Sequence, residues 1–136
     1  MGKVLALDIG GQRTGLAESD PLQMMAFPLK TVATGDLMEA LEAYMRLEHP
    51  KTLVIGKPAM LRKGRTNSTE IIEIWAEKIH NRWPLLEIIF IDEDFTSVEA
   101  SQLLIQGGMR KSKRKEKGAL DKVAASLILE RYLAKH

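Results

Sequence analysis

The chain has 136 residues, of which 45% are hydrophobic and 28% are charged, and its formal net charge is +2. This length and this composition predict one folded domain, residues 1–136, and exclude an intrinsically disordered chain. The absence of cysteine excludes disulfides and thiolate zinc sites, and no apolar run reaches the length of a membrane span, so a cytoplasmic protein without a membrane partner is expected.

The first two strands are predicted to surround a glycine-rich turn. Residues 4–7 form a short apolar run that is typical of a buried strand, and this strand delivers Asp8 into the turn. Residues 15–18 indicate a second strand. Gly10 and Gly15 are expected to give the backbone the freedom that such a turn needs.

The next segments begin an alternation of strands and helices. Residues 27–32 could form a third strand, which Pro28 would place at a sheet edge or a bulge. The chain is thus expected to open with two or three antiparallel strands. Apolar residues recur at spacings of three and four over 37–47, which predicts a first helix. A short strand is expected over 53–56, and a second helix begins near residue 67.

The last third of the chain continues this alternation. Residues 86–91 form the most strand-like run, and Thr96 starts a predicted helix that ends before Gly107. The last helix is expected over 119–133, with Asp121 in its first turn. The pattern favours an α/β fold with a mainly parallel sheet and helices on both of its faces.

Acidic residues follow the first and the last predicted strand. Asp8 follows the first strand, Asp92, Glu93 and Asp94 follow the last, and Asp121 opens the final helix. If the first and fourth strands are parallel neighbours, their carboxyl ends lie side by side and carboxylates there would converge. Clustered carboxylates repel one another unless one is protonated or a cation lies between them. Oxygen ligands suit Mg²⁺ or Mn²⁺, and a pair of such ions can promote phosphodiester hydrolysis.

Basic residues gather in two segments near these acids in the sequence. One run, between residues 110 and 117, has six cations and one acid, and Lys57 belongs to a smaller basic group. Such clusters attract a polyanion whatever the total charge, so a nucleic acid is the expected partner. The six cations of the run are Arg110, Lys111, Lys113, Arg114, Lys115 and Lys117.

Four sequence blocks carry a resemblance to a known family: LALDIGGQRTGLA, VIGKP, IDEDFTSVEA and LDKVAASLILERYL. In this order and spacing, and over nearly the whole chain, they resemble the YqgF family, whose members are described as pre-16S rRNA nucleases or Holliday-junction-resolvase-like proteins. The resemblance implies a three-layer RNase H-like fold, with a five-stranded mixed sheet, helices on both faces and an acidic divalent-metal site. It places the family's acids at Asp8, Glu93 and Asp121. It also matches Arg13 and Thr96 to family positions in the same blocks, and these two residues are expected to bind the nucleic acid.

The function implied by this resemblance is metal-dependent nucleic-acid cleavage. We expect a nuclease of the two-metal type that acts on structured RNA. The favoured reaction is processing of the 5′ end of precursor 16S rRNA during ribosome biogenesis. The protein is expected to be a monomer or a weak homodimer. Asp8 and Asp121 would hold the metals, and Glu93 would bridge them or orient a water. The chain departs from the family pattern at Asp94, which replaces a common arginine and so a potential phosphate contact.

Other interpretations of the same residues stay open. Cleavage of four-way DNA junctions would use the same chemistry but would need a dimer. The hairpin from Asp8 to Gly15 is also typical of actin-like ATPases, which enclose a nucleotide between two such domains. A non-catalytic RNA-binding factor in ribosome assembly would need only the basic run. In purely structural terms, Asp8 could shape its turn, Asp121 could interact with the helix dipole, and the basic run could be a solvated loop.

Overall fold

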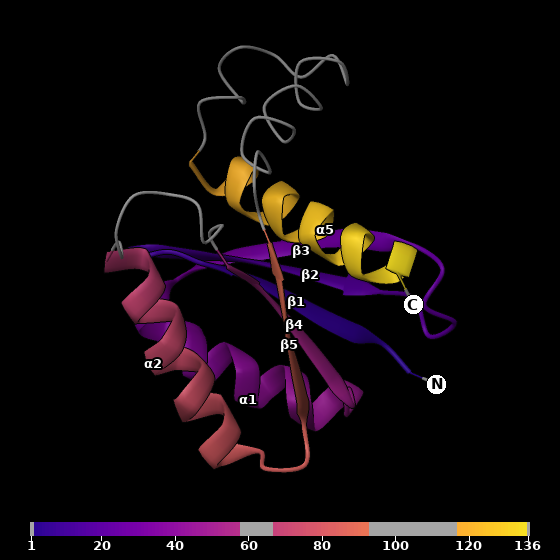
Figure 1. Cartoon of the computed structure of the whole chain (residues 1–136), viewed down its shortest axis with the longest axis horizontal. Helices are drawn as coiled ribbons and strands as arrows, with labels where there is room; N and C mark the ends of the chain where they lie inside the picture. Colours follow the sequence, from indigo (N-terminus) through magenta and orange to yellow (C-terminus); the bar gives the residue numbers. More distant parts are fainter. Residues whose placement is uncertain (1, 58–66, 93–116, 136) are drawn as a thin grey trace.

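A five-stranded mixed sheet forms the centre of the structure, a computed structural model that describes residues 2–57, 67–92 and 117–135 (Figure 1). The strands lie in the order β3-β2-β1-β4-β5. β1 pairs with β2 and β2 with β3 in antiparallel fashion, whereas β1 with β4 and β4 with β5 are parallel pairs. The strands are β1 (Val4–Ile9), β2 (Arg13–Ser19), β3 (Ala26–Ala33), β4 (Thr52–Lys57) and β5 (Glu87–Asp92).

This topology confirms the expected mixed sheet and corrects the expected share of parallel strands. The mixed sheet implied by the family resemblance is confirmed, and the first and fourth strands are parallel neighbours as expected. The antiparallel pairs β1–β2 and β2–β3 confirm the expected antiparallel opening. The expectation of a mainly parallel sheet is therefore correct only for the pairs β1–β4 and β4–β5. The strand that leads to the acidic segment 92–94 is β5, and β4 separates it from β1.

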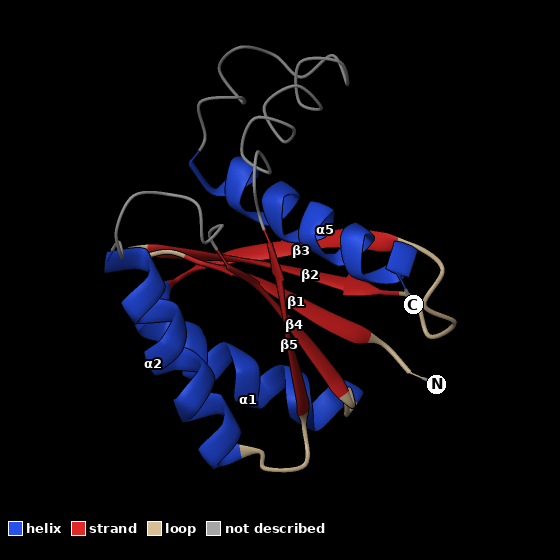
Figure 2. Ribbon diagram, viewed as in Figure 1, coloured by secondary structure: helices blue, strands red, loops and turns tan. Residues whose placement is uncertain are grey.

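Helices cover both faces of the sheet, as expected (Figure 2). A short 3₁₀ helix, η1 (Thr34–Asp36), leads into α1 (Leu37–Glu48), which lies with α2 (Asn67–Arg82) on one face. α5 (Lys117–Lys135) crosses the other face. The helix predicted to start at Thr96 lies outside the described residues. None of the helices in the described segments is both long and apolar enough to cross a membrane.

The strand β1 is buried on both sides, which explains its continuous apolar sequence. Leu5 and Leu7 belong to a core cluster that includes residues of α1 and α2. Val4 and Ala6 belong to a second cluster, which they share with residues of α5. Because side chains alternate along a strand, Asp8 falls on the α5 face.

The strand β3 is an edge strand, which confirms the expectation drawn from Pro28. The β2–β3 register shifts between Leu16 and Ala17, so that Leu16 pairs with Lys30 while Ala17 pairs with Pro28. Proline lacks a backbone N–H and is tolerated at such an irregular edge position.

Candidate metal and nucleic-acid site

Asp8 and Asp121 come together through the packing of α5 on β2. Asp8 pairs across the sheet with Gly15, and both face α5. A Cβ atom built on Gly15 would overlap the backbone carbonyl of Asp121, so the helix backbone lies directly on the strand at this residue. Gly15 was expected to ease the turn. Its observed role is to permit this close approach, which brings two distant acids to one face.

Asp121 lies deeper in its helix than its sequence context suggests. α5 begins at Lys117 rather than at residue 119, with Gly118 inside the helix. The expectation that Asp121 belongs to the first turn is therefore wrong, since it is the fifth helical residue. The interaction of a charge with the helix dipole falls off within the first turn. The helix dipole is therefore a weaker explanation for a carboxylate at residue 121.

Arg13 forms an ion pair with Asp121. The Arg13 Nε atom donates a hydrogen bond to Asp121 Oδ2 at 2.8 Å, and the two side chains are 37% and 22% exposed. A hydrogen bond between two charged groups at this distance is among the stronger kinds in proteins. The residue that the family resemblance matched to a nucleic-acid-binding position is thus, in this structure, the counter-ion of a candidate metal ligand.

The glycine turn before Arg13 is held by backbone and side-chain hydrogen bonds. The Gly10 N–H donates to the Arg13 carbonyl at 2.9 Å, and the Thr34 N–H donates to the Gln12 carbonyl at 2.9 Å. The buried Thr34 hydroxyl donates to the Gly10 carbonyl at 2.6 Å and lies 3.0 Å from the Thr14 hydroxyl. Thr34 was not among the predicted site residues, because no sequence motif marks a threonine that reaches the turn from the end of another strand.

Lys57 lies on the other face of the sheet from Asp8. It ends β4 and lies on the same face of the strand as Leu53 and Ile55, which belong to the core cluster beneath α1 and α2. Its Nζ atom lies 5.3 Å from the centre of the Phe90 ring, a cation–π distance. The described structure therefore does not bring Lys57 together with Asp8 and Asp121.

The acidic strand end and the basic run are described only in part. Asp92 is exposed at the end of β5, and its carbonyl accepts a 2.7 Å hydrogen bond from Arg131 Nη1 in α5. Glu93, Thr96 and the basic residues from Arg110 to Lys115 lie outside the described residues, as does the side chain of Lys117.

The described carboxylates suit a hard cation. No group of three potential metal-binding side chains occurs within the parts of the chain that the structure describes, so Asp8 and Asp121 would be two ligands of a larger set. Both offer oxygen atoms, which Mg²⁺ and Mn²⁺ prefer. A cationic group, the Arg13 guanidinium, already contacts one of them. This donor set fits a divalent cation.

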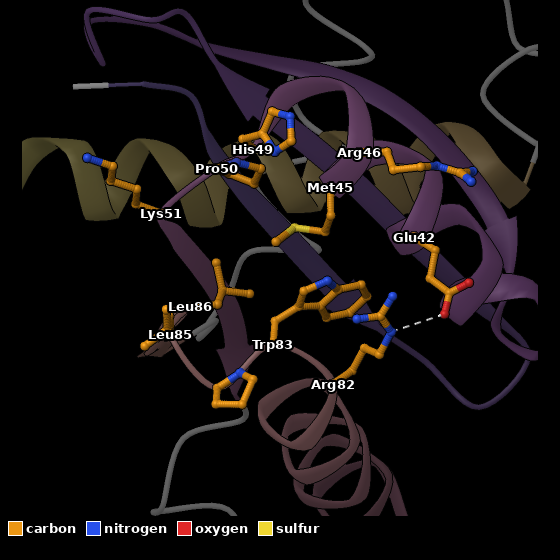
Figure 3. A pocket seen from close by; sticks show the side chains of 11 residues that line it. Glu42, Met45, Arg46, His49, Pro50, Lys51, Arg82, Trp83, Leu85 and Leu86 are labelled. Carbon is orange, nitrogen blue, oxygen red and sulfur yellow. Dashed lines mark hydrogen bonds and ion pairs between the residues drawn. The ribbon is translucent and has the colours of Figure 1, made fainter.

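A cavity of about 710 Å³ lies at the opposite end of the sheet, where α1 and α2 end and β4 and β5 begin (Figure 3). Met45, Trp83 and Leu86 supply much of its apolar wall. Glu42 is the one acid among its described lining residues, and it forms an ion pair with Arg82 at 3.4 Å. With a single carboxylate among its described lining residues, this cavity does not offer the set of oxygen ligands that a divalent cation needs.

Comparison with known proteins identifies the family. Residues 2–135 match the family described as RuvX: Holliday junction resolvase. A protein of Porphyromonas gingivalis is 37% identical over 98% of this chain and 96% of its own length, and one of Amoebophilus asiaticus is 35% identical over 100% and 96%. Both are named "Putative pre-16S rRNA nuclease".

Solved structures show the same fold. Thermus thermophilus RuvC matches with a TM-score of 0.53 and 15% identity, over 98% of this chain and 95% of that chain. The same protein in complex with a Holliday junction substrate matches with a TM-score of 0.56 and 14% identity, over 99% and 96%. The likeness confirms the RNase H-like fold, in its RuvC-like form. The match over residues 2–135 and the identity to the two curated relatives show that the chain belongs to the RuvX family, the YqgF family that its sequence blocks resemble.

Proposed function

We propose that this chain is a metal-dependent nuclease that hydrolyses phosphodiester bonds in precursor 16S rRNA in the cytoplasm. The observation that carries the proposal is the placement of Asp8 and Asp121 on one face of the sheet by the Gly15 contact. The names of the relatives support the choice of substrate.

The proposed mechanism assigns each residue a part. Asp8 and Asp121, with Glu93 as a third ligand, would hold Mg²⁺ or Mn²⁺. When bound, such ions lower the pKa of a coordinated water and stabilise the leaving oxygen of a phosphodiester. Glu93 would orient the attacking water. Arg13, next to Asp121, would meet a phosphate oxygen of the bound strand.

The remaining predicted residues would bind the RNA backbone. The basic run from Arg110 to Lys117 and the hydroxyl of Thr96 would contact phosphates. Each phosphate that a cation neutralises releases condensed counterions, and this release favours binding. Lys57 lies over Phe90 on the far face, so it would contact only RNA that passes around the carboxyl edge of the sheet.

Cleavage of precursor 16S RNA in the presence of Mn²⁺ tests this proposal. We expect the wild-type protein to shorten the 5′ end and the Asp8→Asn variant to be inactive, because it loses a metal ligand. Asp36→Asn is a matched control: it removes one negative charge from an exposed side chain that makes no helix-cap hydrogen bond. Equal cleavage by Asp8→Asn and the wild type would refute the assignment.

Resolution of four-way DNA junctions is a second candidate function, favoured by the description of the matching family. Symmetric cleavage of two strands needs a second copy of the chain, so this activity should appear with dimer formation. The same Mn²⁺ assay with a four-way junction, beside sedimentation measurements, distinguishes the two substrates. RNA binding without cleavage of either substrate would instead support a non-catalytic assembly factor.

A further inference from the structure

We infer that Arg13 is an internal counter-ion of Asp121, and that a divalent cation held at the site would displace Arg13 from Asp121. The displaced Arg13 would then bind a substrate phosphate. This inference rests on the proposed function of Asp8 and Asp121. Its direct observation is the 2.8 Å hydrogen bond from Arg13 Nε to Asp121 Oδ2. Arg13 would thereby link metal binding to substrate binding.

The backbone around this ion pair is fixed, so only the arginine side chain needs to move. The Arg13 carbonyl accepts a hydrogen bond from the Gly10 N–H, and Arg13 pairs with Ala33 across β2 and β3. The Asp121 backbone rests on Gly15. Both ends of the ion pair are thus anchored, while the guanidinium stands at the end of a long, flexible side chain.

The exposure of the pair makes the exchange feasible. The Arg13 side chain is 37% exposed, and ion pairs that remain open to water are weak. A guanidinium in such a pair can leave its partner without being stranded in an apolar interior, where an unpaired charge would be costly.

The charges at the site explain why release should follow metal binding. A divalent cation held by Asp8 and Asp121 would bring two positive charges beside the Arg13 guanidinium. The cation would repel Arg13 and would take its place as the counter-ion of Asp121. The released guanidinium can then bind a phosphodiester, because its planar set of donors matches the phosphate oxygens.

Mn²⁺ binding without substrate tests the competition. We expect Arg13→Gln to bind Mn²⁺ about fivefold more tightly than the wild type, the factor that corresponds to removing a partly exposed ion pair. Isothermal titration calorimetry or the electron paramagnetic resonance signal of free Mn²⁺ measures this affinity. Arg82→Gln is the matched control, because it breaks another Arg Nε–carboxylate pair, with Glu42, at the far end of the sheet.

The side-chain resonances of the arginines test the release itself. We expect the Arg13 Nε–H signal in ¹⁵N NMR spectra to shift and to exchange faster with water when Mg²⁺ is added. The Arg82 Nε–H signal, which also belongs to an ion pair, serves as an internal reference and should not change. Asp8→Asn should suppress the response of Arg13.

The outcomes separate this inference from the proposed function. If Asp8→Asn abolishes Mn²⁺ binding but Arg13→Gln leaves it unchanged or weakens it, Arg13 is a structural partner of Asp121 and the inference is overturned alone. An Arg13 Nε–H signal that does not change when Mg²⁺ is added would also overturn the inference alone. If the wild type binds no Mn²⁺ that depends on Asp8, both the proposed function and the inference fail.

Discussion

Gly15 of β2 lies so close to Asp121 of α5 that a side chain of any size at residue 15 would overlap the Asp121 carbonyl. The same glycine is the cross-strand partner of Asp8. The absence of a side chain at residue 15 therefore lets the α5 backbone at Asp121 lie directly on the strand residue that pairs with Asp8.

The first prediction concerns this contact. Gly15→Ala should lower the free energy of unfolding by about 1–3 kcal/mol, the usual cost of forcing a methyl group into a packed interior. It should also weaken Mn²⁺ binding, because α5 must move away from β2 and carry Asp121 with it. Urea denaturation and calorimetry measure the two effects. Gly35→Ala is the control, since a Cβ at Gly35 meets nothing within 4 Å. Unchanged stability and Mn²⁺ affinity in Gly15→Ala would contradict the structure.

The second prediction concerns the support of the glycine turn. Thr34→Val keeps the shape of a buried side chain but removes the hydroxyl that donates to the Gly10 carbonyl. We expect a loss of about 1–3 kcal/mol of stability, because the partly buried Gly10 carbonyl loses its donor and the buried Thr14 hydroxyl loses its partner. Thr52→Val is the control, as the Thr52 hydroxyl makes an exposed bond to Glu87 and its loss should cost little. Equal denaturation midpoints for the two variants would show that Thr34 does not hold the turn.

The strands and most helices could be predicted because their signals are local. β1 is buried on both of its faces, and its sequence is therefore continuously apolar. β3 lies at the edge of the sheet, where Pro28 is tolerated, so this proline indicated the edge position. Asp8 stood out as a candidate because a carboxylate at the end of a buried strand needs a partner. The sequence could not show that α5 starts at Lys117, since a glycine in the second helical position argues against a start before it.

The contacts inside the site depend on tertiary packing, and no local pattern reveals them. The Arg13–Asp121 ion pair joins the first residue of β2 to a helix near the other end of the chain. The position of Lys57 over Phe90 depends on the alternation of β4 and on its pairing with β5. The sequence alone therefore places Lys57 in a basic group near the predicted site, but it does not show on which face of the sheet Lys57 lies.

The third prediction is a pH dependence that arises far from the site. Tyr44 is buried and its hydroxyl donates to Glu18 Oε1 at 2.9 Å. Burial, followed by the hydrogen bond to Glu18, raises the pKa of Tyr44 above its ordinary value of 10.0. The folded state therefore keeps the proton when the unfolded chain has lost it. The stabilisation is complete below about pH 10 and falls as the pH rises beyond it, by up to about 1.4 kcal/mol per pH unit.

Urea denaturation between pH 8 and pH 11 checks this prediction. Other groups also titrate in this range, so the informative quantity is the difference between the wild type and Tyr44→Phe. The variant should lose less stability than the wild type as the pH rises above 10, because it has no phenol to ionise. Parallel stability curves for the two proteins would show that Tyr44 does not contribute.

The last prediction separates the two faces of the sheet in RNA binding. Each phosphate contact that a cation makes adds roughly 0.7–0.9 to the slope of log affinity against log salt concentration. In the proposed complex, the double variant Lys111→Gln/Lys113→Gln should therefore reduce the magnitude of this slope by about 1.4–1.8. Lys57→Gln should reduce it by much less than the roughly 0.7–0.9 that one phosphate contact contributes. The Lys57 ammonium group forms a cation–π contact with the Phe90 ring on the face of the sheet opposite Asp8. Fluorescence anisotropy with labelled precursor RNA, in an Asp8→Asn background that prevents cleavage, measures the slopes. A larger loss for Lys57→Gln than for the double variant would place the RNA on the α1 and α2 face and would separate RNA binding from the Asp8 site.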